Sequence, residues 1–299
     1  MGTSSSYGGA SGGTPLVPSW LQGDGGGDAG GGDGGLPSPD DGTPPGQNDG
    51  GAPSAPSAPP ARPVAPTAGD SDRYTAARGN FTRFTSSGGS DRRSLGRAVS
   101  QYVSRAAGGS RNAASRMGSS RGAGAGLVRF LNNVATNGVR EALRTLNLEG
   151  LAGRPIEEIF AGLADYICPE GGSIDDGIAR DAFVETIADL AGAGITDLDG
   201  LTPPQIQTIF ELYATHAIEA RLCNDIGSKV VTVPADARAA GRVQAQLRDF
   251  IQRGVSDALS AAAMAVQALT PDAVIGFVTG IYQSAFQILQ TMGDAEAAT

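Results

Sequence analysis

The sequence predicts an all-α protein, in which a helical bundle-like domain follows a long disordered tail rich in Gly and Pro. Three observations support this fold class. Gly and Pro fill 31 of the first 72 positions, and both residues oppose helix and sheet. From about residue 92 onward, apolar residues recur at helical spacing. The one strand-like run, 229–233, has no convincing partner, so we interpret it as an extended connector.

Composition divides the chain into four segments. Residues 22–60 hold a single large apolar side chain, Leu36. Such a stretch buries too little apolar surface to offset a backbone ordering entropy of about 1–2 kcal/mol per residue. We therefore expect a recognition peptide at 1–21, a disordered linker at 22–72, an Arg-rich and partly helical belt at 73–125, and an all-α domain at 126–299.

The first 21 residues differ from the linker because they carry large apolar side chains. Tyr7, Leu16 and Trp20 are among them, and Trp20 is the chain's only Trp. Gly8 and Gly9 keep the backbone between them flexible. A short apolar cluster on a flexible tether is typical of a recognition peptide. The alternative is that the cluster folds back onto the domain as an ordered arm.

Apolar stripes at helical spacing define the elements of the domain. Pro155 opens one stripe and Pro169 closes it, Ser173 with Asp176 resembles a capping pair, and Thr202-Pro203-Pro204 opens the next helix. The last two helices are expected at about 236–269 and 271–292. The stripes lie at 95–103, 127–146, 156–167, 178–190, 206–222, 243–259 and 274–289.

The net charge of −9 conceals a basic belt. Residues 1–72 carry a net charge of −7, residues 73–145 one of +11, and residues 146–299 one of −13. All thirteen cations of the basic segment are Arg, whose guanidinium pairs in bidentate fashion with carboxylate or phosphate. Two interpretations follow: the belt pairs with the protein's own acidic segments, or it binds phosphate, with the candidate residues Arg92, Arg93, Arg97 and Arg105.

The sequence gives little support for an enzyme. The only His, His216, lies near the apolar face of its helix and has no triad partners. No Glu-x-x-His pair indicates a di-metal site, so Glu219 is expected to be solvated or paired with Arg221. Asp175 and Asp176 suit a helix start without metal. We therefore expect no catalytic residue, no metal and no cofactor.

Cysteine usage and hydropathy indicate the cellular compartment in which the protein is expected. Cys168 and Cys223 lie 55 residues apart without a CxxC motif, so buried free thiols are expected. No apolar run approaches the ~18–20 residues of a membrane span, and the N-terminus has no signal-peptide h-region. We expect a cytoplasmic protein that does not engage a membrane.

The N-terminal peptide resembles a known family. The residues that carry the resemblance are Met1 to Ser4, the pairs Gly8-Gly9 and Gly12-Gly13, the run Thr14 to Pro18, and Trp20, followed by the Gly/Asp/Pro-rich linker. This layout is similar to that of the QatB family of bacterial Qat anti-phage defence systems. The helical remainder resembles the family only by pattern. The resemblance implies a defence function, with the partner-binding residues Thr3, Ser4, Tyr7, Gly8, Gly9, Pro15, Leu16, Pro18 and Trp20.

The resemblance also implies partners. Such systems combine an ATPase, a protein like this one, an enzyme similar to the deazaguanine-synthesis protein QueC, and a TatD-like nuclease. A QueC-like enzyme activates a carboxylate as an adenylate and passes it to an amine. The α-amine of Gly2, once Met1 is removed, would serve as the acceptor. The competing interpretation is an Arg-belted adaptor that binds nucleic acid or the ATPase; an all-α hydrolase is disfavoured because no catalytic constellation is visible.

Overall fold

The computed structural model describes residues 72–168, 172–227, 236–262 and 269–299. These residues form ten α-helices with short 3-10 and π-helical turns, and they contain no strand. The predicted all-α class is confirmed. The recognition peptide at 1–21, the linker up to residue 71 and the strand-like run 229–233 lie outside the described residues.

The helices follow one another through short connections. A π-helical turn, η3 (Tyr102–Ala106), directly continues the second helix. The ten α-helices are α1 (Thr75–Ser86), α2 (Arg92–Gln101), α3 (Ser110–Ser115), α4 (Ser119–Asn137), α5 (Val139–Arg144), α6 (Ile156–Ile167), α7 (Ile174–Leu190), α8 (Pro203–Gly227), α9 (Ala237–Ala261) and α10 (Ala273–Ala298).

Capping chemistry explains where several helices begin. α6 follows Pro155 directly, and α8 opens at Pro203, as predicted. Ser173 caps α7 and forms a reciprocal capping box with Asp176. The two C-terminal helices differ from the expected ranges, since α9 ends at Ala261 and α10 extends to Ala298.

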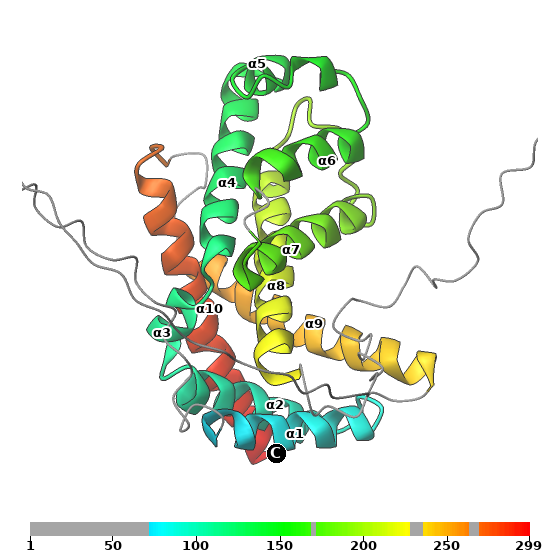
Figure 1. Ribbon diagram of the computed structural model, residues 1–299, viewed down its shortest axis with the longest axis vertical. Helices are drawn as coiled ribbons and strands as arrows, with labels where there is room; N and C mark the ends of the chain where they lie inside the picture. Colours follow the sequence, from blue (N-terminus) through cyan, green and yellow to red (C-terminus); the bar gives the residue numbers. More distant parts are fainter. Residues whose placement is uncertain (1–71, 169–171, 228–235, 263–268) are drawn as a thin grey trace, which may run out of the picture. The chain divides into compact units, whose positions relative to one another are not determined.

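The core is built around α8, which runs through the middle of the helical body and contacts α4, α7 and α9 (Figure 1). Residues 213–219 of this helix are all buried, as expected of a helix enclosed on every side. Rings from neighbouring helices pack around it: Phe183 lies 5.6 Å from Phe160 and 6.1 Å from Tyr213, between ring centroids.

α10 and α2 cross with their backbones almost in contact. A Cβ added to Gly293 would lie 2.5 Å from the carbonyl oxygen of Gly96, and one added to Gly96 would lie 2.8 Å from the carbonyl oxygen of Gly293. Both distances are far shorter than normal van der Waals contact. Beside the crossing, Ser100 donates a hydrogen bond to Asp294. The missing side chains therefore allow α2 to lie directly on the C-terminal helix.

The belt is part of the same core. Helical spacing was expected only from about residue 92, yet α1 forms earlier and buries Phe81 and Phe84. Residues 69–299 make up one compact unit, so the helices of 73–125 and those of 126–299 share a core. α1 is hard to predict from the sequence because Gly79, Asn80 and several Thr residues are poor helix formers.

Replacing Gly293 with Ala should destabilise the protein by roughly 1–3 kcal/mol, because the added methyl group forces α2 and α10 apart. Gly280→Ala is the matched control: Gly280 lies on the same helix with no atom within 4 Å of the added Cβ, so this variant should gain up to about 1 kcal/mol from helix propensity. Urea unfolding followed by circular dichroism measures both. Equal stability of the two variants would contradict a tight crossing.

Candidate functional site

Three of the four arginines predicted to bind phosphate lie along one side of α2 and η3. Arg93 and Arg105 are exposed and Arg97 is half-buried. Arg83 of α1 lies beside them, since its guanidinium donates to Asn80 and Asn80 donates to Gln101 of α2, at 3.4 and 2.9 Å. We call Arg83, Arg93, Arg97 and Arg105 the arginine face.

Arg92, the fourth predicted residue, points to a different neighbour. Its Nε and one terminal nitrogen donate to Oε1 of Gln246 on α9, at 3.2 and 3.1 Å. With Glu211, Asp249 and Arg253 it lines an open cleft of about 480 Å³. Charges of both signs meet in this cleft, and Arg92 therefore lies outside the arginine face.

The arginine face is not neutralised by the acidic part of the chain that the structure describes. None of its four members forms a salt bridge with a described carboxylate. The nearest acid on α2 is Asp91, whose carboxylate caps the helix by accepting from the backbone N–H of Ser94. Hydrogen bonds from Ser94 lower the pKa of Asp91, and Arg93 and Arg97 contribute further.

A separate polar seam does join the belt to the rest of the core. Arg221 of α8, almost fully buried, donates to the carbonyl oxygen of Arg116 and to Oδ1 of Asp175 at 2.5 Å. Gly118 is required beside it, because its φ of +45° suits Gly and a Cβ there would overlap the Asp175 carboxylate. The ion pair of the seam joins two residues outside the belt, and the belt contributes the backbone carbonyl of Arg116; no member of the arginine face takes part.

His216 lies in a buried charged cluster between α7, α8 and α9. Its Nε2 is 2.9 Å from Oδ2 of Asp189, and its Nδ1 is 4.0 Å from Oε2 of Glu219. Arg248 donates from Nε to Glu219 at 3.0 Å and lies 3.6 Å from Asp189. Glu219 is therefore neither solvated nor paired with Arg221, contrary to the expectation from its sequence.

Two carboxyl groups of the cluster respond to the same environment in opposite ways. Burial raises the pKa of Glu219, although Arg248 and His216 oppose the effect. The hydrogen bond with His216 lowers the pKa of Asp189. Hydrogen bonds and ion pairs of the cluster join three helices, which is a structural arrangement.

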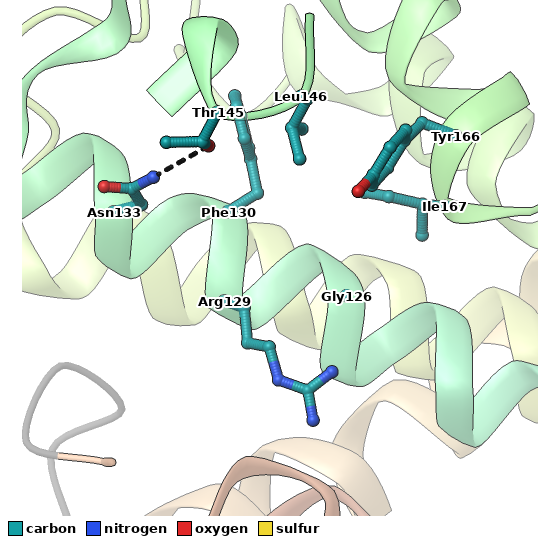
Figure 2. A pocket seen from close by; sticks show the side chains of 8 residues that line it. All are labelled: Gly126, Arg129, Phe130, Asn133, Thr145, Leu146, Tyr166 and Ile167. Atoms are coloured by element: carbon teal, nitrogen blue, oxygen red, sulfur yellow. Dashed lines mark hydrogen bonds between the residues drawn. The ribbon is translucent and has the colours of Figure 1, made fainter. Parts of the chain in front are cut away.

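A second cleft opens between α4, the end of α5 and α6 (Figure 2). It has a volume of about 320 Å³, and Phe130, Leu146 and Ile167 form apolar walls. Tyr166 stands at its edge with 57% of its surface exposed. This cleft could not be predicted from the sequence, because Tyr166 falls outside the apolar stripe of its helix. Its lining offers contacts to an apolar group and no set of reacting groups.

The helical body corresponds to a known family. A family model described as the Qat anti-phage system associated protein QatB matches residues 108–289, more than half of the chain. The chain belongs to the QatB family. Membership makes it a component of an anti-phage defence system. Comparisons with curated proteins and with solved structures found no significant match.

The QatB match covers α3 to α9 and most of α10, which is the part that resembled the family only by pattern. The buried cluster at His216 and the cleft at Tyr166 lie within the matched range. The arginine face and the candidate residues Gly2, Thr3, Ser4, Tyr7, Gly8, Gly9, Pro15, Leu16, Pro18 and Trp20 precede it. Those ten N-terminal residues also lie outside the described residues. Among the helices that the structure describes, none has the length and apolar character of a membrane span.

The two carboxyl groups of the cluster predict opposite pH dependences. The raised pKa of Glu219 stabilises the fold most below its ordinary value of 4.5, so wild type should lose stability relative to Glu219→Gln as pH rises above that value. The lowered pKa of Asp189 stabilises the fold above 3.8, so wild type should lose stability relative to Asp189→Asn as pH falls below that value. Urea unfolding between pH 3 and 8 tests both, and slopes of the same sign would contradict the assignment.

Proposed function

We propose that this QatB-family protein is a non-enzymatic component of its defence system, and that a QueC-like enzyme binds its N-terminal peptide and modifies it at Gly2. The observation that carries the proposal is the peptide itself. Tyr7, Leu16 and Trp20 are large side chains on a Gly-rich segment that lies far along the sequence from the helical core. A recognition peptide of this kind supplies anchors and leaves its end free to enter an active site.

The chemistry favours the α-amine of Gly2 as acceptor. An α-amine ordinarily has a pKa of about 7.7–8.0, against about 10.4 for a lysine side chain, so much more of it is neutral and nucleophilic at physiological pH. Lys229 is the only lysine of the chain. The amine nitrogen would attack the acyl carbon of an adenylate, form an amide, displace AMP and lose a proton.

The described core supports the non-enzymatic part of the proposal. The only His of the chain is held between Asp189 and Glu219, and Arg248 closes the cluster. His216 is thus engaged in packing three helices and is buried away from solvent. The ATPase and the TatD-like nuclease of the system are proposed as further partners of the same protein.

Intact-mass analysis tests the acceptor. Protein co-expressed with the QueC-like enzyme should gain mass, and protein expressed without it should not. Gly2→Glu, which blocks removal of Met1, should abolish the gain, whereas the matched control Lys229→Arg should retain it. A mass gain that survives Gly2→Glu, or that is lost in Lys229→Arg, would overturn the assignment to Gly2.

Trp20→Ala should weaken binding of the QueC-like enzyme by about 30-fold, the effect of losing one interfacial anchor of about 2 kcal/mol. Leu36→Ala removes the single large apolar side chain of 22–60 and should change the affinity less than about threefold. Titration of the enzyme against both variants gives the affinities, and circular dichroism checks that the helices persist. Equal effects of the two substitutions would exclude Trp20 as an anchor.

A second candidate function is an adaptor that binds nucleic acid or the system's ATPase. The specific observation in its favour is the arginine face, whose four guanidinium groups form no salt bridge with a described carboxylate. This candidate depends on the face and does not require Gly2.

A further inference from the structure

We propose that the arginine face binds the phosphodiester backbone of double-stranded nucleic acid without reading its sequence. The proposal rests on the second candidate function and gives it a ligand and a set of residues. Arg93, Arg97 and Arg105 recur every four or eight residues along α2 and η3, and Arg83 lies beside them on α1. Four residues of α-helix advance about 6 Å, so the guanidinium groups form a row rather than a cluster.

The π-helical turn keeps this row straight. Residues four apart on an α-helix drift steadily around its axis, because four residues exceed one turn. In η3 the backbone N–H of Ala107 donates to the carbonyl oxygen of Tyr102, five residues back, at 2.8 Å. This wider turn winds the chain through a smaller angle per residue. Arg105 is thereby brought back toward the line of Arg93 and Arg97.

The row is rigid and remains available to a ligand. The Arg83–Asn80–Gln101 hydrogen bonds link its two helices, and the Gly96–Gly293 crossing fixes α2 on α10. Two acids near α2 are engaged elsewhere: Asp91 caps the helix, and Asp294 accepts from Ser100. Arginine side chains on fixed helices that form no salt bridge with a described carboxylate suit phosphate oxygens.

The surroundings of the face favour a duplex over a single strand. The aromatic residues of the described belt, Tyr74, Phe81, Phe84 and Tyr102, are all buried. Single-strand binding relies on exposed aromatic rings that stack on the bases, and the face offers none. Guanidinium groups alone contact the backbone and carry no sequence information.

The surroundings also favour nucleic acid over an acidic protein. Stable protein interfaces have an apolar centre within a polar rim. The large apolar side chains that the described residues expose are Tyr166, Ile174, Val184 and Ile275, on α6, α7 and α10. The face itself has a charged surface without such a centre.

Fluorescence anisotropy of the full-length protein with labelled 20-base-pair DNA and RNA duplexes of two unrelated sequences tests the proposal. Wild type should bind both sequences equally, with an affinity that falls steeply between 50 and 200 mM salt. The triple variant Arg93→Glu, Arg97→Glu, Arg105→Glu should lose at least about tenfold in affinity and reduce the salt slope by about 3. Binding to either duplex supports the proposal, and the preferred duplex identifies the natural ligand class.

A charge-matched control separates the face from net charge. Arg140, Arg154 and Arg238 are exposed residues outside the face, so the corresponding triple Glu variant should bind within about threefold of wild type. Four outcomes would each overturn the proposal: equal losses in both variants, no duplex binding at 50 mM salt, a preference for single strands, or binding of the purified ATPase in place of nucleic acid.

A separate measurement distinguishes this proposal from the modification of Gly2. When the triple variant of the face is co-expressed with the QueC-like enzyme, its intact mass should still show the modification at Gly2.

Discussion

The close crossing of α2 and α10 is the constraint on which the rest of the structure depends. Gly96 and Gly293 let two helix backbones meet where any side chain would hold them apart. Because α10 also packs against α4 and α9, this contact ties the belt to the helices around α8. One side of α2 is buried by the crossing, and its charged residues are left on the other side. The arginine face is therefore a consequence of how the core is closed.

Two polar clusters inside the core contain charged side chains that lie outside the arginine face. The Arg221 seam joins the belt to α7 and α8, and the His216 cluster joins α7, α8 and α9. Removing one partner from such a site leaves a buried charge without compensation, which typically costs 3–5 kcal/mol. Several acidic residues of the C-terminal part therefore stabilise the packing of its own helices. The arginines of the face remain outside both clusters.

Local signals made much of the helical architecture predictable. Pro155, Pro203 and the Ser173–Asp176 capping pair act within one turn of chain, so their effects can be recognised without knowledge of the fold. α1 could not be recognised in the same way, because its poor helix formers are compensated by the burial of Phe81 and Phe84 against distant helices. The glycine crossing likewise depends on two residues from opposite ends of the described chain.

The candidate site residues differ in the same way. Arg93, Arg97 and Arg105 could be proposed together from the sequence because their charge and spacing are properties of one continuous segment. Arg92 could not be separated from them, since its partner Gln246 comes from α9. The cluster around His216 draws on three helices, and the cleft at Tyr166 depends on how α4 and α6 approach each other. Such sites follow from packing, which a single sequence leaves open.

We propose that the protein acts through a modified N-terminal peptide carried by a folded, non-enzymatic helical body. Tandem mass spectrometry of the N-terminal proteolytic peptide tests it most directly, with protein isolated from cells that carry the complete defence system and from cells that lack the QueC-like enzyme. We expect an added acyl group on the α-amine of Gly2 in the first sample and a free Gly2 amine in the second. An unmodified Gly2 in both samples, or a modification located elsewhere in the chain, would contradict it.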